Sequence, residues 1–428
     1  MVRIIRISSF AKTFNNYALQ LVLFLAVFIS TVIPVESATI KQIPVIALFL
    51  CALGFRNFLK GKRIYLLTGL IIILFTSMLA NGILVMKDLF LYFFSYIVIY
   101  YIVSRGGFDY RFLYLFIVLT LLWYLLKNPN TVTYIPQKMV INVYGEGTKH
   151  GTALLGTALM LPALYVCYLR WHLALRLRWT DIVCLIWGGY FIFFSSSRSA
   201  VLAALATILM LAVNWNGLKR WLTWTLFWVF NLSTYFLELL QGYTRDLNNI
   251  PILSDFIHVD NFDKTVGVTS GRAWLWKYHI DTFLSHPILG GGREFTDFSV
   301  NDYIGRLGEN AHAGSESPFT GMLACNGIIG LIQIGLAIFL FHRAVRAKNV
   351  LGTTIMFCCI YNTTMGMNYM INRGVCVLIM ALYFMSFYDN RLLAYPRVLL
   401  KNLKDYREKQ SLRTTYSNHN NTANDKES

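Results

Sequence analysis

Long apolar runs, separated by short segments rich in turn-forming and basic residues, dominate this chain of 428 residues. Runs of about 18 residues or more recur from Tyr17 onward, which is close to the length that crosses a bilayer as a helix. The first run is interpreted as a retained span because no small-residue cleavage pattern follows it. The pattern predicts twelve spans, near residues 17–34, 43–58, 64–82, 89–104, 110–126, 151–169, 180–196, 199–214, 221–240, 319–341, 351–370 and 373–388.

Composition supports this prediction. Hydrophobic residues make up 56% of the chain and charged residues only 14%, whereas soluble proteins carry about 25% charged residues. We therefore expect an all-α polytopic membrane protein of about twelve transmembrane helices. The net charge of +17 does not indicate a nucleic-acid partner, because the basic residues cluster in short loops between apolar runs.

The basic loops also predict the orientation of the chain. When twelve spans are counted, they all fall on one side, at residues 3–12, 56–63, 170–178, 219–220 and 343–348. The positive-inside rule makes that side the cytoplasm, with both termini inside. We expect one transmembrane domain over 1–388 and a polar, basic, disordered cytoplasmic tail over 389–428.

The outer face then carries the loop 127–150, a tight turn at Arg198 and one long extracytoplasmic loop, 241–318. Loops of that length are usually functional. Within it, Trp274, Tyr278, Ile280 and Phe283 stand near helical spacing. They predict an amphipathic helix over 271–287 at the outer membrane boundary, followed by a glycine-rich turn.

Four arginines are candidates for binding a multiply charged anion. Arg198 lies among serines between two apolar runs, where an arginine is costly unless it is paired or hydrated. The long loop adds Arg272, Arg293 and Arg306. Arginine grips phosphate oxygens with a planar fork. The alternatives are an Arg198 that snorkels to the headgroups and a merely solvated Arg306.

His312 and Glu316 are the candidates for proton transfer. They stand in the run GENAHAGSESPFTGML (308–323) before an apolar span. Histidine is the usual general base near neutral pH, and a neighbouring carboxylate can orient it. A structural alternative is the start of a helix, with Ser315 or Ser317 as its cap and Pro318 in its first turn.

No metal or cofactor is predicted. The seven cysteines lack CxxC spacing and are interpreted as packing residues. The predicted outer histidines other than His312 also lack metal-site spacing; they are His150, His258, His279 and His286.

Three segments in order resemble the O-antigen ligase / O-antigen polymerase superfamily of bacterial envelope polysaccharide enzymes. They are SSSRSAVLAAL (195–205), GRAWLWKYHIDTFLSHPILGGGREF (271–295) and AHAGSESPFTGMLACNGIIGL (311–331). The resemblance covers about 151–345, including the long outer loop, and is compositional elsewhere.

The resemblance implies a membrane-embedded glycosyltransferase in the bacterial inner membrane, with its site facing the periplasm. The donor would be an undecaprenyl-diphosphate-linked glycan, and the acceptor a glycan or lipid A-core. Arg198 and Arg272, with Arg293 beside them, would bind the diphosphate, and His312 would activate the acceptor hydroxyl. A chain-length regulator would be a partner of a polymerase.

One departure from the family pattern bears on the activity. The family histidine stands closer to the Gly-x-x-Gly element, and Glu316 occupies roughly that position here. This favours an O-antigen polymerase over a ligase, and it leaves open whether His312 or Glu316 is the base. A lipid-linked sugar flippase and a structural membrane scaffold are the alternatives from other classes. A flippase would place charged residues along a midplane cavity, whereas here polar residues concentrate on one face.

Overall fold

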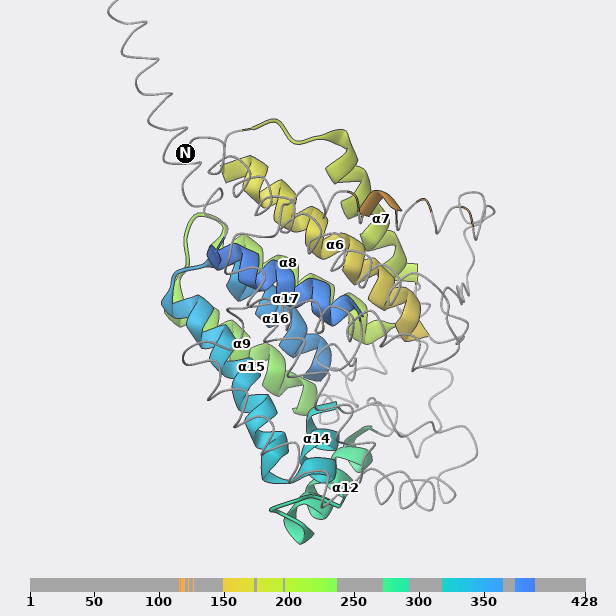
Figure 1. Ribbon diagram of the computed structural model, residues 1–428, viewed down its shortest axis with the longest axis vertical. Helices are drawn as coiled ribbons and strands as arrows, with labels where there is room; N and C mark the ends of the chain where they lie inside the picture. The colour runs from red at the N-terminus through yellow and green to blue at the C-terminus, as the bar shows by residue number, and fades with distance from the viewer. Residues whose placement is uncertain are drawn as a thin grey trace, which may run out of the picture.

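The regular secondary structure of the described residues is entirely helical (Figure 1). The structure is a computed structural model, and it describes residues 115, 117–119, 122, 126, 149–172, 175–194, 197–236, 272–291, 318–364 and 374–388. The predicted spans before residue 110, and the tail from 389, lie outside these residues. The all-α class therefore agrees with the described part, while the number of spans stays a prediction.

Six helices begin and end close to predicted spans. They are α6 (Lys149–His172), α7 (Trp179–Phe194), α8 (Arg198–Asn214), α9 (Arg220–Phe236), α16 (Val350–Thr364) and α17 (Gly374–Tyr388). Within the described residues, α15 (Ile328–Arg346) is the one helix long and apolar enough to cross a membrane by those two measures. Shorter apolar helices cover 179–193, 199–214 and 350–364.

The prediction of one continuous span over 319–341 was wrong. This segment forms two helices, α14 (Pro318–Asn326) and α15, which are separated at Gly327. Gly327 has φ of 57° and ψ of −132°, a backbone conformation that glycine adopts without the steric cost of a side chain. The hydrophobic run does not reveal this break, because both helices are apolar.

The core forms around α16, of which every residue is buried. Its hydroxyl and amide side chains bond within the helix or to neighbours, as apolar surroundings require. Thr363 Oγ1 donates to the Cys359 carbonyl at 2.7 Å, and Thr364 Oγ1 donates to Asn231 Oδ1 of α9 at 2.7 Å. The largest fully buried side chains are Tyr165, Phe191, Phe227, Phe341, Phe357 and Tyr383.

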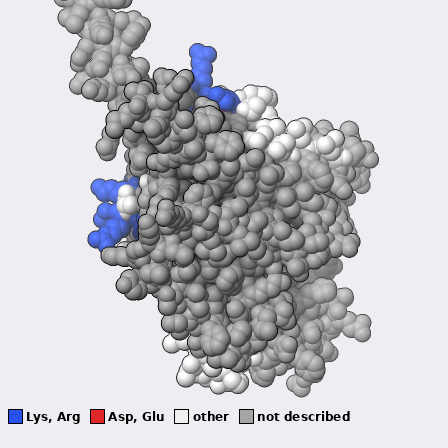
Figure 2. Space-filling view, in the orientation of Figure 1, with Lys and Arg blue, Asp and Glu red and all other residues white. Residues whose placement is uncertain are grey.

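Three of the basic loops lie at one end of the bundle. Trp215, just after α8, packs against Tyr168 and Trp171 near the end of α6, with ring centroids 5.0 and 6.0 Å apart. At the start of α9, Arg220 Nη2 donates to the Arg346 carbonyl at 3.3 Å. Figure 2 shows Lys and Arg side chains at the left and top edges of the molecule. The loops 170–178, 219–220 and 343–348 thus share one end, as the charge pattern predicts.

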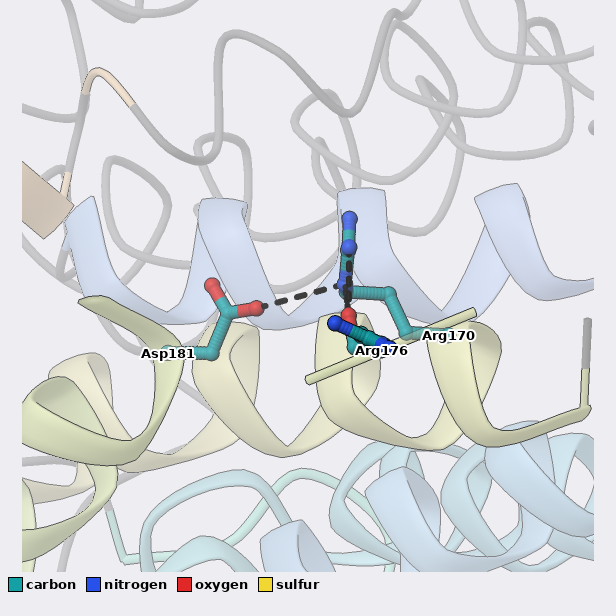
Figure 3. Close-up of polar contacts among 3 residues, drawn as sticks. All are labelled: Arg170, Arg176 and Asp181. Atoms are coloured by element: carbon teal, nitrogen blue, oxygen red, sulfur yellow. Dashed lines mark hydrogen bonds and ion pairs between the residues drawn. The ribbon is translucent and has the colours of Figure 1, made fainter. Parts of the chain in front are cut away.

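A buried carboxylate organises the α6–α7 loop at this end (Figure 3). Asp181 is 2% exposed, and its Oδ2 lies 3.7 Å from Arg170 Nε. The same Arg170 Nε donates to the Arg176 carbonyl at 2.8 Å. One guanidinium therefore closes the loop and faces the buried charge.

Candidate functional site

The starts of α8 and α15 lie at the end of the bundle opposite to these basic loops. Helix α8 runs from Arg198 to Asn214, beside the basic loops, and 17 residues span about 25 Å. Helix α15 ends in the basic loop at Arg346, so its start at Ile328 is likewise distant from the basic end. Figure 1 shows α12 (Arg272–Ser285) and α14 together at that far end.

Arg198 is the first residue of α8, between two buried serines. Ser197 and Ser199 are 4% and 5% exposed, and their hydroxyl oxygens lie 3.1 Å apart at hydrogen-bond distance. The Ser197 carbonyl accepts from the backbone N–H groups of Ala200 and Val201. The start of this apolar helix is therefore polar inside the bundle, as the serine-rich sequence predicts.

Helix α12 is present where the sequence predicts it, and its buried face includes polar side chains. Ile280, which was placed on the apolar stripe, is 43% exposed. Among the α12 side chains that the structure describes, Trp276, His279 and Thr282 are buried. Polar as well as apolar side chains of α12 therefore face inward, with His279 contacting α14.

His279 connects α12 to α14. Its Nδ1 lies 3.1 Å from Thr320 Oγ1, at hydrogen-bond distance. Burial lowers the pKa of His279 to about 4, so the imidazole is neutral near pH 7. Gly321 lies beside the ring, because a Cβ there would be 3.6 Å from His279 Cε1. Position 272 falls on the same helix face as positions 276 and 279 by the i, i+4, i+7 spacing.

The glycine turn after α12 docks onto the α14–α15 break. The N–H of Gly291 donates to the Ala324 carbonyl at 2.7 Å, and the N–H of Ile328 donates to the Ile288 carbonyl at 3.3 Å. Gly290 has φ of 77°, and a Cβ on it would lie 2.4 Å from the Cys325 carbonyl carbon. Segments 272–291 and 318–330 therefore form one unit whose backbones touch.

The outward side of this unit is apolar. Ile280, Leu284 and Ile288 are 43%, 67% and 69% exposed, and Ile328 and Leu331 at the start of α15 are 53% and 46% exposed. The hydrogen bond between Ile328 and Ile288 makes the two sets neighbours. An exposed apolar surface of this kind fits contact with lipid.

Several candidate residues lie outside the described residues. Arg293, Arg306, His312 and Glu316 belong to this group, so their roles stay predictions. Arg198 and Arg272 are the first residues of α8 and α12, and their side chains lie outside the described part of the structure. No group of His, Cys, Asp and Glu within the described residues is arranged to hold a metal ion.

Sequence reasoning missed the pairing of His279 with Thr320. It treated His279 only as a potential metal ligand, for which the spacing was wrong. The i, i+7 spacing from Arg272 to His279 puts the two positions on one helix face. This spacing could have indicated that His279 shares a face with a candidate site residue. The partner Thr320 could not be found that way, because the contact joins residues 41 positions apart.

Comparison with known proteins supports the family. Residues 182–335 match the family model described as O-antigen ligase. This match confirms that the segment belongs to the O-antigen ligase/polymerase superfamily, as the three motifs predict. The family consists of membrane proteins, and it implies a glycosyl-transfer enzyme that uses a lipid-linked glycan in lipopolysaccharide biosynthesis. No curated protein matches the chain.

Proposed function

We propose that the protein is a polymerase of O-antigen or capsule-like repeat units. It transfers a glycan from an undecaprenyl-diphosphate carrier to an acceptor sugar hydroxyl, in the bacterial inner membrane with its site facing the periplasm. The observation that carries this proposal is the family match, which encloses Arg198, Arg272, Arg293, His312 and Glu316. The position of Arg198 and Arg272 as the first residues of α8 and α12 supports it.

The proposed donor site uses arginines at two helix starts. Arg198 and Arg272 open α8 and α12, and Arg293 follows the glycine turn by two residues. Fixed cations stabilise the charge that develops on a diphosphate leaving group as the glycosidic bond breaks. The exposed apolar surface around Leu284 and Ile288 supports this placement, because a prenyl chain needs lipid contact beside the diphosphate.

The proposed reaction is a single displacement that needs no metal. The acceptor hydroxyl oxygen attacks the anomeric carbon, and the bond from that carbon to the phosphate oxygen breaks. Undecaprenyl diphosphate leaves with the bonding electron pair. The hydroxyl proton passes to the base, for which His312 and Glu316 are the candidates.

The packed unit of α12, glycine turn and α14 supports a shared site for donor and acceptor. Glu316 stands two positions before Pro318, the first residue of α14, and α14 is held to α12 through His279 and Thr320. Residues that bind the donor and residues that activate the acceptor would thereby keep a fixed relation. Positioning of this kind is worth several powers of ten in rate.

A ligase that transfers the glycan to lipid A-core is the second candidate. The family model described as O-antigen ligase favours it, whereas Glu316 at the position of the family histidine favours the polymerase. A chain-length regulator would be a partner only of the polymerase.

The test is the glycan ladder of a strain that lacks the gene. Single repeat units on the core mean that a polymerase is lost, whereas a bare core with accumulated lipid-linked glycan means that a ligase is lost. Complementation with Arg198→Lys should fail although the charge is kept, because a lysine lacks the guanidinium fork. A normal ladder from Arg198→Lys at normal protein level would remove Arg198 from the donor site.

A further inference from the structure

A second charged surface lies at the other end of the bundle, where α9 begins and α15 ends. Lys219, Arg220, Arg346 and Lys348 are exposed there, and Arg343 is half-buried. We call these five residues the α9–α15 basic cluster. They come from segments that are 126 residues apart and are joined by the bond from Arg220 to the Arg346 carbonyl.

The chain places no carboxylate on the elements that carry this cluster. Residues 215–236 and 328–364 contain no Asp or Glu. The exposed cations of the cluster, Lys219, Arg220, Arg346 and Lys348, raise the local positive potential, which attracts anions. Arg343 is further positioned over the Phe387 ring, with its guanidinium carbon 5.1 Å from the ring centroid.

Apolar stripes lead from the cluster along the outer faces of both helices. On α9, Trp221, Trp228 and Leu232 are 73%, 46% and 47% exposed, at the spacing of one helix face. On α15, Phe339 is 57% exposed and stands seven residues before Arg346, which is again the same face.

The two helices contact one another through aromatic side chains that are not part of these stripes. The rings of Phe227 and Phe341 are stacked with centroids 4.4 Å apart. Trp224 lies 5.0 Å from Phe341 and 6.0 Å from His342, centroid to centroid. The cluster and the exposed apolar residues are therefore carried by two helices that contact one another, which Figure 1 shows side by side.

We propose that this surface binds an anionic phospholipid, with the phosphate at the α9–α15 basic cluster and the acyl chains along the stripes. Cations above an apolar, Trp-flanked surface match an amphipathic anion better than they match an acidic protein, which needs no stripe. Basic residues near a membrane surface attract anionic lipid by about 1 kcal/mol each. The proposal shares only the membrane setting with the proposed function and does not use the glycosyl-transfer site.

The test measures lipid binding by the full-length protein in neutral detergent. Phosphatidylglycerol is titrated, and bound lipid is counted by native mass spectrometry while the thermal unfolding midpoint is followed. Phosphatidylcholine and inorganic phosphate are the comparison ligands. We expect phosphatidylglycerol alone to be retained and to raise the midpoint.

Matched variants decide whether the cluster is responsible. Arg220→Gln/Arg346→Gln should weaken phosphatidylglycerol binding by about tenfold or more, whereas Arg176→Gln/Arg178→Gln removes the same charge from another loop at the same end and should stay within about twofold. Arg346→Gln alone leaves the bond to its backbone carbonyl intact and should lose binding part-way, which separates lipid binding from a folding defect.

Three results would overturn the proposal. They are equal losses in the two double variants, equal retention of phosphatidylcholine, and a midpoint shift by inorganic phosphate as large as that by the lipid. Because no turnover is measured, a failure here leaves the glycan ladder unaffected, and a failed ladder leaves the lipid measurement unaffected.

Discussion

Replacing Gly290 by alanine should separate the glycine turn from the α14–α15 break. A Cβ at this position would lie 2.4 Å from both the carbonyl carbon and oxygen of Cys325, and 2.5 Å from the Asn326 nitrogen. These are backbone atoms of a helix end, so they cannot rotate aside. The residue also has φ of 77°, which an L-residue adopts at a cost of about 1 kcal/mol.

The expected loss is the sum of two effects. Overpacking against fixed backbone costs about 1–3 kcal/mol, and the left-handed conformation adds about 1 kcal/mol. Gly290→Ala should therefore lower the free energy of unfolding by about 2–4 kcal/mol. The hydrogen bonds of Gly291 to Ala324 and of Ile328 to Ile288 should be lost first, because they flank the contact.

Two further glycines make the measurement a matched series. Gly335 lies inside α15, and a Cβ added to it would meet nothing within 4 Å, so Gly335→Ala should be neutral or slightly stabilising. Gly217 has φ of 139° and the same open space, so Gly217→Ala isolates the backbone cost.

The assay is thermal unfolding followed with a thiol-reactive dye, since Cys167, Cys184, Cys358 and Cys359 are buried and react when the bundle opens. The midpoints should fall in the order Gly335→Ala, Gly217→Ala, Gly290→Ala. A Gly290→Ala midpoint equal to that of Gly335→Ala would refute the close backbone contact.

Three other perturbations should give distinct results. If His312 is the base, His312→Ala should keep donor binding while turnover falls by about 10²–10⁴-fold. Glu316→Gln should then lower turnover by about tenfold. Full turnover in His312→Ala with an inactive Glu316→Gln would reverse the assignment. Burial lowers the pKa of His279 from 6.5 to about 4, so the unfolded chain binds a proton in this interval and the folded chain does not. Unfolding free energy should then fall by about 2–3 kcal/mol as the pH drops from 6.5 to 4, and a His279→Gln variant with an unchanged pH dependence would contradict this. Arg170→Met should destabilise the protein by about 2–4 kcal/mol by leaving the Asp181 carboxylate buried without its cation, and less in an Asp181→Asn background; equal losses in both backgrounds would show that the pair is uncoupled.

Much of the described fold could be predicted from the sequence because apolar runs and basic loops are local features that indicate where helices begin and end. Apolar runs gave α8 and α9 to within a few residues, and a serine-flanked Arg198 proved to be the first residue of α8. The basic loops predicted which helix ends meet, since charge keeps a loop out of the apolar layer whatever the helices pack against. These features need no knowledge of a partner segment.

The break at Gly327 and the buried face of α12 could not be predicted in this way, because each depends on a distant partner. Gly327 meets Gly290 and Ile288, and a Cβ on it would lie 2.6 Å from the Gly290 nitrogen. His279 can be buried because its Nδ1 lies at hydrogen-bond distance from Thr320 Oγ1. In the sequence, Gly327 is one glycine inside an apolar run, and His279 is one polar residue on a predicted loop helix. Neither pattern indicates the distant partner.

The break changes what the third family segment can do. Helix α14 has nine residues and is about 14 Å long, less than half of the roughly 30 Å that a bilayer core requires. It is therefore too short to cross a membrane, and we expect the crossing to begin at α15. Thr320 and Asn326 are buried in the unit that α14 forms with α12 and the glycine turn, at the end of the bundle away from the basic loops. With the crossing predicted at α15, we expect the segment before Pro318, which holds Glu316 and His312, to lie on the same side of the membrane as the start of α8. We accordingly expect cysteines placed at 312 and 316 to react with an impermeant thiol reagent added from outside the membrane, and labelling only after membrane disruption would contradict the shared outer site.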